Sequence, residues 1–272
     1  VYVQVPASMV LSVQQTASSM PHCCFLQLSS ERRLAYDHVP GKAPGVLFCG
    51  GYTSDMTGTK ARALEAFCRA EGRAFVRFDY SGHGASSGEF ADGTIGGWAE
   101  DALAMVDRVI DGPVLVVGSS MGGWIMLLLA LARPERVIGL VGVAAAPDFT
   151  EDLLVPRATA AQRRALREQG YWMQPSAYGG APYPVTARFI EEARAHLVLR
   201  GPIPIRCPVH LLHGQRDPDV PWRTALRLAE RLESEDVTIE LIKAGDHRLS
   251  SERDIARITA AVQRVLAASS DR

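Results

Sequence analysis

The stretch VLVVGSSMGGWIMLL, residues 114–128, places a serine at the junction of a predicted strand and a predicted helix. Residues 114–117 are aliphatic without a break, which favours a strand covered on both faces, and the apolar run that closes the stretch suits a helix. A turn this sharp crowds its flanks, so it requires glycine two residues before and two residues after its central residue. Gly118 and Gly122 meet that requirement around Ser120.

The position of Ser120 suits a nucleophile. Its hydroxyl is predicted to point outward at a helix N-terminus, where unpaired backbone N–H groups and the helix dipole favour developing negative charge. A Gly- and Ser-rich turn without any chemistry would look the same. The loops elsewhere in the chain must decide between the two interpretations.

The composition indicates a globular domain without nucleic-acid or membrane partners. The 272 residues are 47% hydrophobic and 22% charged, and the formal net charge of −1 offers no basic surplus for nucleic acid or an anionic membrane. The longest apolar runs reach about ten residues, well short of the roughly 20 that a membrane-spanning helix needs. The length fits one α/β domain, or such a domain with a modest insertion.

The cysteines predict neither disulfides nor a metal site. There are five, an odd number, without the paired spacing of a disulfide framework or of zinc ligands. We therefore expect a reducing compartment, with the cytoplasm as first choice. Residues 1–30 contain no Lys, Arg, Asp or Glu, which argues against a secretory signal or a mitochondrial transit peptide. Residues 1–22 form an uncertain N-terminal segment. The uncharged stretch fits either an edge strand or a leader upstream of a start at Met9 or Met20.

Strand and helix patterns alternate along most of the chain. This alternation predicts an α/β fold with a mostly parallel central sheet and helices on both faces. The core is expected to comprise residues 23–147 and 201–272. The expected strands are residues 45–49, 74–80, 114–117, 136–146, 207–214 and 237–242, and the expected helices are residues 58–72, 96–110, 124–132, 222–233 and 252–267.

Residues 148–200 interrupt the alternation and are expected to form a small helical lid over the sheet. Two amphipathic helical patterns, residues 159–170 and 186–198, are joined by an aromatic segment rich in Pro and Gly. Large side chains in that segment are candidates for the wall of an apolar substrate pocket, and they fit equally well as the small core of the insertion itself. These candidates are Tyr171, Trp172, Met173, Tyr178 and Tyr183.

A serine nucleophile needs a base, and the base needs an orienting carboxylate. In an open parallel sheet, such groups are expected on the loops at the carboxyl ends of the strands. His247 lies on the last of these loops and is the candidate base. Other histidines are weaker candidates, because His210 lies inside a predicted strand, His213 precedes a tight glycine, and His83 is expected to shape its glycine-rich loop.

Two aspartates that follow another predicted strand, Asp217 and Asp219, are candidates for the acid. The frame Gly-Gln-Arg-Asp with Val-Pro behind it favours Asp217, whereas Asp246 adjoins the histidine and is expected to point elsewhere. The order Ser120, Asp217, His247 is that of α/β hydrolases and differs from the orders of chymotrypsin and subtilisin. Three matches in this order argue against coincidence.

Four motifs together resemble the α/β hydrolase family: GSSMGGW (118–124), FDYSGHGASSG (78–88), LLHGQRDPDVPW (211–222) and GDHRLS (245–250). The last three are most similar to the mitochondrial acyl-protein thioesterase type that also cleaves mycophenolic acid acyl-glucuronide. The resemblance extends over residues 25–267. It implies that the serine, aspartate and histidine above act as nucleophile, acid and base, and it implies a depalmitoylating or acyl-glucuronide-cleaving activity.

An oxyanion hole requires two backbone N–H donors beside the nucleophile. Met121, directly after the serine, is expected to supply one of them. The second is expected from the loop after strand 45–49, where many members of the family carry His-Gly before the donor and this chain carries Gly50-Gly51. This makes Tyr52 the second candidate donor and places Gly51 against the substrate.

These residues predict a serine hydrolase of carboxylic esters or thioesters that forms an acyl-enzyme and uses no metal or cofactor. Its expected partner is a small-molecule or acylated substrate. The same triad fits perhydrolysis or carbon–carbon bond hydrolysis, and the same fold fits a non-catalytic ligand-binding protein. The resemblance adds the mitochondrial matrix as an alternative compartment, and the sequence leaves monomer and dimer open.

Overall fold

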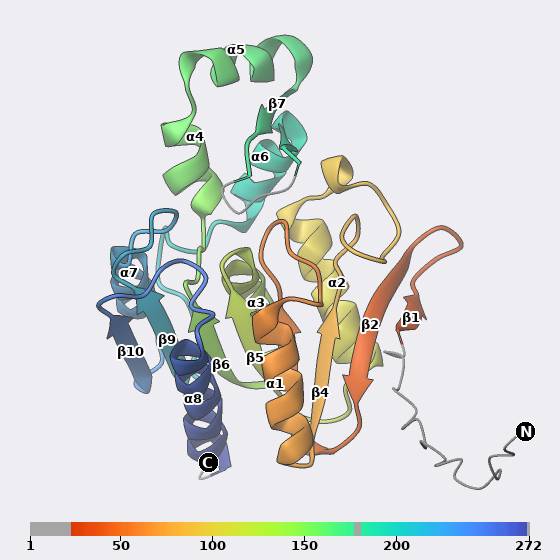
Figure 1. Ribbon diagram of the computed structural model, residues 1–272, viewed down its shortest axis with the longest axis vertical. Helices are drawn as coiled ribbons and strands as arrows, with labels where there is room; N and C mark the ends of the chain where they lie inside the picture. Colours follow the sequence, from red (N-terminus) through yellow and green to blue (C-terminus); the bar gives the residue numbers. More distant parts are fainter. Residues whose placement is uncertain (1–22, 177–180, 271–272) are drawn as a thin grey trace, which may run out of the picture.

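An eight-stranded sheet forms the centre of the molecule (Figure 1). The computed structural model describes residues 23–176 and 181–270. The strand order is β1-β2-β4-β3-β5-β6-β9-β10, in which β1 and β2 are antiparallel to their neighbours and all pairs from β4 to β10 are parallel. The strands are β1 (Cys24–Gln27), β2 (Arg33–Val39), β3 (Lys42–Cys49), β4 (Arg73–Phe78), β5 (Val114–Ser119), β6 (Val137–Val143), β9 (Val209–Gly214) and β10 (Val237–Ile242).

Helices cover both faces of this sheet, as the alternating pattern predicts. In β5, Val114 and Val116 pack into the core on one face, while Leu115 and Val117 pack into the core on the other. This two-sided burial explains why the strand is aliphatic without interruption. One face is covered by α1 (Thr59–Ala70) and α8 (Glu252–Ser270), and the other by α2 (Ile95–Arg108), α3 (Met121–Ala132) and α7 (Arg223–Arg231). Among the described helices, none is both long and apolar enough to cross a bilayer.

The first strands form an antiparallel edge. β1 lies at the end of the sheet. It is the edge strand that the sequence offers as one interpretation of its uncharged N-terminal stretch. β2, between β1 and β4, was not predicted. Its sequence, RLAYDHV, mixes charged and apolar residues because only some of its side chains are buried, so neither strict alternation nor a continuous apolar run marks it.

The lid stands above the carboxyl ends of the parallel strands (Figure 1). The segment between its helical patterns was expected to be a loop, but it contains an antiparallel hairpin in which Trp172 pairs with Val185. We propose residues 148 and 200 as the lid's boundaries. Its elements are η2 (Thr150–Leu154), α4 (Val155–Arg157), α5 (Ala160–Gln169), β7 (Tyr171–Gln174), β8 (Tyr183–Thr186), α6 (Ala187–Ala193) and η3 (Arg194–His196).

Candidate active site

Ser120 occupies a strained turn between β5 and α3. Its φ of 55° and ψ of −120° lie in a region that residues with a side chain rarely adopt. A Cβ atom at Gly122 would collide with the carbonyl oxygen of Cys49, and one at Gly118 would collide with the backbone of Gly122. Both flanking glycines are therefore needed for the close approach of strand and helix, as the sequence predicts.

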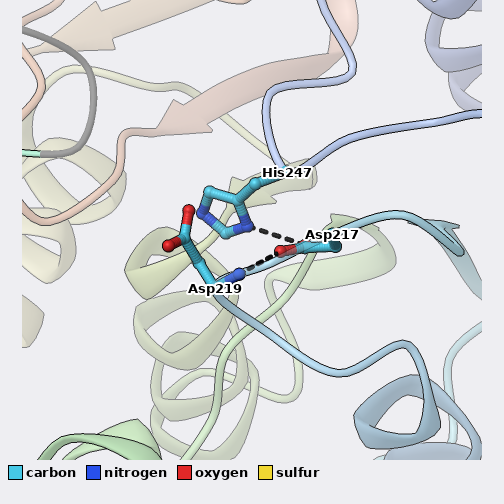
Figure 2. A group of neighbouring side chains, drawn as sticks. All are labelled: Asp217, Asp219 and His247. Atoms are coloured by element: carbon cyan, nitrogen blue, oxygen red, sulfur yellow. Dashed lines mark hydrogen bonds and ion pairs between the residues drawn. The ribbon is translucent and has the colours of Figure 1, made fainter.

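Ser120, His247 and Asp217 form one chain of hydrogen bonds. The Ser120 hydroxyl lies 3.0 Å from Nε2 of His247. Figure 2 shows the second contact, in which Nδ1 of His247 lies 2.8 Å from Oδ2 of Asp217. Since the aspartate is an acceptor, Nδ1 carries the hydrogen, and Nε2 presents a lone pair that can accept the proton of the serine. Asp217 comes from the loop after β9 and His247 from the loop after β10. The structure thus brings together the three residues that the sequence selects.

The carboxylate of Asp217 is fully buried and fully hydrogen-bonded. Its Oδ1 accepts the backbone N–H groups of Asp219 and Val220, each at 2.8 Å, and its side chain is 0% exposed. Burial alone would raise the pKa of Asp217, but hydrogen bonds from His213, His247 and the Val220 N–H hold that pKa well below its usual range. Asp217 therefore stabilises the fold above its ordinary pKa, and this contribution is lost as the pH falls through the lowered value.

Neither alternative acid takes the place of Asp217. Asp219 lies beside the His247 ring, but the Nδ1–H of His247 donates to Asp217 (Figure 2). Asp246 accepts the backbone N–H groups of Arg248 and Leu249 and so caps the turn of its own loop. The geometry supports the choice of Asp217 over both alternatives.

The same cluster has the composition of a metal site. Asp217, Asp219 and His247 each offer a ligand atom, and these atoms lie within 4.8 Å of one another; no other such group occurs in residues 23–176 and 181–270. However, one nitrogen of His247 binds Asp217 and the other faces Ser120. With both nitrogens engaged, the arrangement fits a proton relay better than a metal centre.

The two candidate oxyanion donors approach Ser120 from different elements. Met121 is the first residue of α3, and Tyr52 lies in the loop after β3. A Cβ atom at Gly51 would lie 3.6 Å from the Cβ of Ser120, so this loop passes directly beside the nucleophile. Nε2 of His83 lies 2.6 Å from the carbonyl oxygen of Tyr52, which accepts its hydrogen bond and tethers the loop. The role of both residues as oxyanion donors is our proposal.

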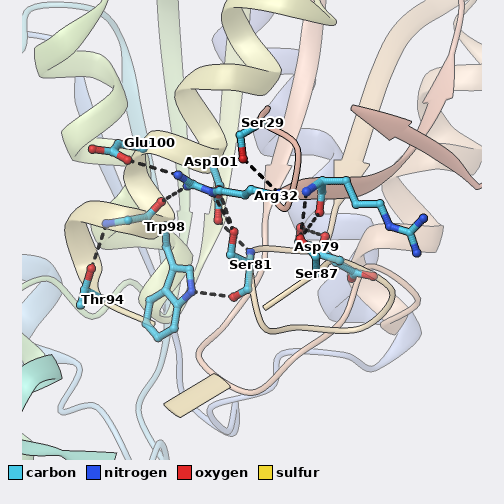
Figure 3. A network of polar contacts seen from close by, with 12 residues as sticks. Ser29, Arg32, Asp79, Ser81, Ser87, Thr94, Trp98, Glu100 and Asp101 are labelled. Atoms are coloured by element: carbon cyan, nitrogen blue, oxygen red, sulfur yellow. Dashed lines mark hydrogen bonds and ion pairs between the residues drawn. The ribbon is translucent and has the colours of Figure 1, made fainter. Parts of the chain in front are cut away.

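A buried polar network supports the glycine-rich loop that carries His83 (Figure 3). Asp101 on α2 is 0% exposed and accepts hydrogen bonds from the Arg32 guanidinium at 2.5 Å and from the Ser81 backbone N–H at 2.8 Å. The indole N–H of Trp98 donates to the Ser81 carbonyl oxygen at 3.0 Å. The loop is thereby fixed to α2 and to the β1–β2 turn. This agrees with a loop-shaping role for His83.

A pocket of about 610 Å³ lies beside Ser120, between the core loops and the lid. Gly51, Tyr52 and Met121 line it, as predicted. Its apolar wall, which comes mostly from the lid, includes Phe149, Leu153, Leu154, Ala158, Trp172 and Tyr183. Its charged wall includes Asp55, Lys60, Arg157, Asp219 and Arg248.

Only part of the predicted lid pocket is found where we expected it. Trp172 is 3% exposed and lines the pocket. Tyr171 and Met173 are 40% and 49% exposed and are not among the lining residues, which corrects the expectation that they contact substrate. The reason is the unpredicted strand β7, whose successive side chains point to opposite faces. Tyr178 lies outside the described residues.

Lys60 is a pocket residue that the sequence did not reveal. It is the second residue of α1, where a lysine normally suggests a solvated face. Its Nζ donates to the carbonyl oxygen of Arg248 at 2.5 Å and so holds the loop that carries His247. Burial, and then the charge of Arg248, lower its pKa to about 8. No sequence signal links these two segments.

Comparisons with known proteins place the chain among its relatives. Residues 46–261 match the family described as the alpha/beta hydrolase family. The chain is 46% identical over 234 residues to the Mus musculus protein named palmitoyl-protein thioesterase ABHD10, mitochondrial, covering 85% of this chain and 78% of that one. The Homo sapiens protein of that name is 44% identical over 232 residues, covering 85% of this chain and 76% of its own.

Two solved structures extend the match. The mouse alpha/beta hydrolase domain-containing protein 10 superposes with a TM-score of 0.82 at 42% identity, covering 90% of this chain and 98% of that one. A putative hydrolase from Agrobacterium vitis S4 gives a TM-score of 0.85 at 42% identity, covering 90% and 97%. These matches confirm the predicted fold and the predicted hydrolase class. The chain belongs to the α/β hydrolase family.

Proposed function

We propose that this protein hydrolyses carboxylic thioesters and esters through an acyl-enzyme formed on Ser120. The serine oxygen attacks the substrate carbonyl carbon while His247 takes its proton, and Asp217 stabilises the resulting imidazolium. The backbone N–H groups of Tyr52 and Met121 bind the oxyanion. His247 then protonates the departing thiolate or alkoxide. A water molecule, deprotonated by the same imidazole, attacks the acyl carbon. The bond from that carbon to the Ser120 oxygen then breaks, His247 returns the proton to this oxygen, and the carboxylic acid is released.

The observation that carries this proposal is the hydrogen-bond chain through Ser120, His247 and Asp217, at 3.0 and 2.8 Å, beside a pocket of about 610 Å³. The alternative is a ligand-binding protein of the same fold in which this hydroxyl does not react with substrate. A fluorophosphonate probe separates the two cases, because it reacts with an activated serine. Labelling mapped to Ser120 by mass spectrometry is expected; a folded but unlabelled protein favours the binding role.

The substrate class we propose is the thioester of a long acyl chain. The relatives named palmitoyl-protein thioesterases suggest it, and the apolar wall of the pocket supports it. An acyl-glucuronide is a second candidate. Lys60, Arg157 and Arg248 also line the pocket, and a glucuronate leaving group carries a carboxylate that these cations would attract.

The preference for acyl chain length is expected to depend on Trp172. Each buried methylene contributes roughly 0.8 kcal/mol, so kcat/KM should rise about fourfold per added CH₂ until the apolar space is full. Trp172→Ala enlarges that space and should move the optimum to longer chains. We would measure kcat/KM for thioesters of graded chain length with both proteins.

Tyr171→Ala is the matched control. Tyr171 lies next to Trp172 on β7, but its side chain is on the exposed face. The control should therefore keep the wild-type optimum. A flat chain-length profile in the wild type, or the same optimum in Trp172→Ala, would assign this tryptophan to the packing of the lid alone.

The pH dependence of kcat/KM should report one ionisation on its acidic side. The lowered pKa of Asp217 keeps it a carboxylate throughout the working range, so His247 is the group whose protonation removes activity. A plot of log kcat/KM against pH should rise with a slope of about 1 and then level off. A slope near 2 would show that a second group, such as Asp217 or Asp219, must also lose a proton.

We also revise the expected compartment. The two mammalian relatives are named as mitochondrial proteins, and nothing in the comparisons favours the cytoplasm. We propose the mitochondrial matrix where the source cell has mitochondria. The Agrobacterium vitis structure indicates that this type of chain also occurs in bacteria. Fractionation with a tagged full-length chain tests the assignment, and a tagged chain found only in the cytosol would reject it.

A further inference from the structure

A second histidine, His213, contacts the carboxylate of Asp217. His213 is next to last in β9, and its ring is completely buried. Its Nε2 lies 3.3 Å from Oδ2 of Asp217 and 3.0 Å from the carbonyl oxygen of Val220. Both neighbours are acceptors, so Nε2 carries a hydrogen and donates it.

The other nitrogen of His213 determines its charge state. Nδ1 is buried and has no hydrogen-bond partner among the residues that the structure describes. A hydrogen on Nδ1 would therefore be buried without an acceptor, which is costly. The ring is accordingly neutral, with its one hydrogen on Nε2, which binds the carbonyl oxygen of Val220 and lies 3.3 Å from Oδ2 of Asp217.

This donor shares one oxygen with the candidate base. Oδ1 of Asp217 is held by backbone N–H groups, whereas Oδ2 lies between Nδ1 of His247 at 2.8 Å and Nε2 of His213 at 3.3 Å. Every N–H that stabilises Oδ2 reduces the negative charge it presents to the other donor. Without His213, that oxygen would interact with His247 alone.

We propose that His213 is a positioning residue for the catalytic acid: its Nε2–H shares Oδ2 of Asp217 with His247 and limits how strongly that carboxylate holds the His247 imidazolium. The inference rests on the proposed function, because it adds a residue to the same triad. Its consequence is that His247 stays neutral, and able to accept the proton of Ser120, at lower pH than Asp217 alone would allow.

Other charged or titratable groups also face His247. Asp219 lies beside the ring (Figure 2). On the loop of His247, Asp246 caps the turn. Lys60, from α1, donates to the carbonyl oxygen of Arg248 on the same loop. Arg157 binds the carbonyl oxygen of Asp219. His213 is not a partner in these contacts, but it also binds the carbonyl oxygen of Val220, next to Asp219. A variant that keeps a donor at Nε2 is therefore the control for movement of that loop.

The test compares two amides of different reach. In His213→Gln, the side-chain amide nitrogen reaches the position of Nε2 and keeps a donor to Asp217, whereas in His213→Asn it reaches only the position of Nδ1. Both variants are made in Ser120→Ala, and the ring of His247 is titrated by NMR. Relative to Ser120→Ala alone, the Asn variant should move the midpoint up by about one pH unit, and the Gln variant should leave it nearly unchanged.

The active enzyme should show the same pattern. With Ser120 present, the acidic limb of kcat/KM should move up in His213→Asn, with about a tenfold loss below the wild-type midpoint and little loss well above it. His213→Gln should restore the wild-type profile. If the Asn variant does not fold, His213→Leu, which also lacks a donor, takes its place with the same expectation.

A purely structural role predicts something different. It lowers activity equally at all pH values and leaves the midpoint of His247 where it was. An unchanged or lowered midpoint in His213→Asn therefore overturns the proposal, even where activity falls. A folded wild type that reacts with no fluorophosphonate would instead overturn the triad assignment, and the NMR comparison would still report whether His213 acts on His247.

Discussion

Ser120→Ala is expected to abolish hydrolysis of esters and thioesters, with a loss of about 10⁶-fold in kcat, because it removes only the attacking oxygen. The side chain of Ser120 makes no capping hydrogen bond to α3. Alanine has the same Cβ, so it should hold the strained turn about as well as serine. Turnover of an acyl thioester and fluorophosphonate labelling should be lost together, while the thermal unfolding midpoint stays close to that of the wild type.

Residual activity is the decisive readout for this variant. A purified Ser120→Ala protein that retains more than a few per cent of wild-type turnover, with contamination excluded by active-site labelling, would remove Ser120 from the mechanism. Loss of activity together with a collapse of the thermal transition would indicate instead that the turn had failed. His247→Ala provides a second check. Removing the base should abolish both thioester turnover and fluorophosphonate labelling, while the turn at Ser120 is left unchanged.

Asp217→Asn should reduce kcat by about 10⁴-fold, since the true acid fixes the tautomer of the base. Oδ2 of Asp217 accepts the Nδ1–H of His247, and Nε2 of His213 lies 3.3 Å from the same oxygen. An amide nitrogen at that position would oppose these donors, and an amide oxygen there would lack the negative charge that stabilises the imidazolium. The measurement is kcat at saturating thioester, accompanied by thermal unfolding.

Asp219→Asn is the matched control, because it removes a carboxylate from the same loop. The backbone N–H of Asp219 donates to Asp217, and this contact survives the substitution. We expect a loss below about tenfold, as for a charge that lies near the imidazole without orienting it. A more severe loss at Asp219 than at Asp217 would show that the acid is assigned two residues too early.

The turn at Ser120 could be predicted because its causes are local. The switch from a two-sided aliphatic strand to an apolar helix, and the glycines that allow their close approach, lie within one short segment. The order of serine, aspartate and histidine was equally readable, because each follows a strand of a parallel sheet. Such strands bring their carboxyl ends to one edge whatever the loops contain.

The hairpin in the lid could not be predicted from the sequence. Its aromatic segment is predicted as a loop because Pro and Gly interrupt it. The segment is a hairpin because Trp172 pairs with Val185, and neither β7 nor β8 has a sequence pattern that predicts this pairing. Once β7 exists, alternation of side chains sends Trp172 into the pocket and leaves Tyr171 and Met173 outside. The sequence identified these residues as candidates for the pocket wall, but it could not tell which of them face the pocket and which face solvent.

The sequence by itself therefore determined the α/β fold, the nucleophile turn and the loops that carry the candidate base and acid. Periodicity and glycine spacing depend on backbone sterics and on burial, which act over neighbouring residues. The motif frame also selected Asp217 as the acid. Only the tertiary structure revealed that His213 lies against Asp217 and that Lys60 holds the histidine loop. Those contacts require donor and acceptor within about 3 Å, and segments far apart in the chain reach that distance only after the sheet has assembled.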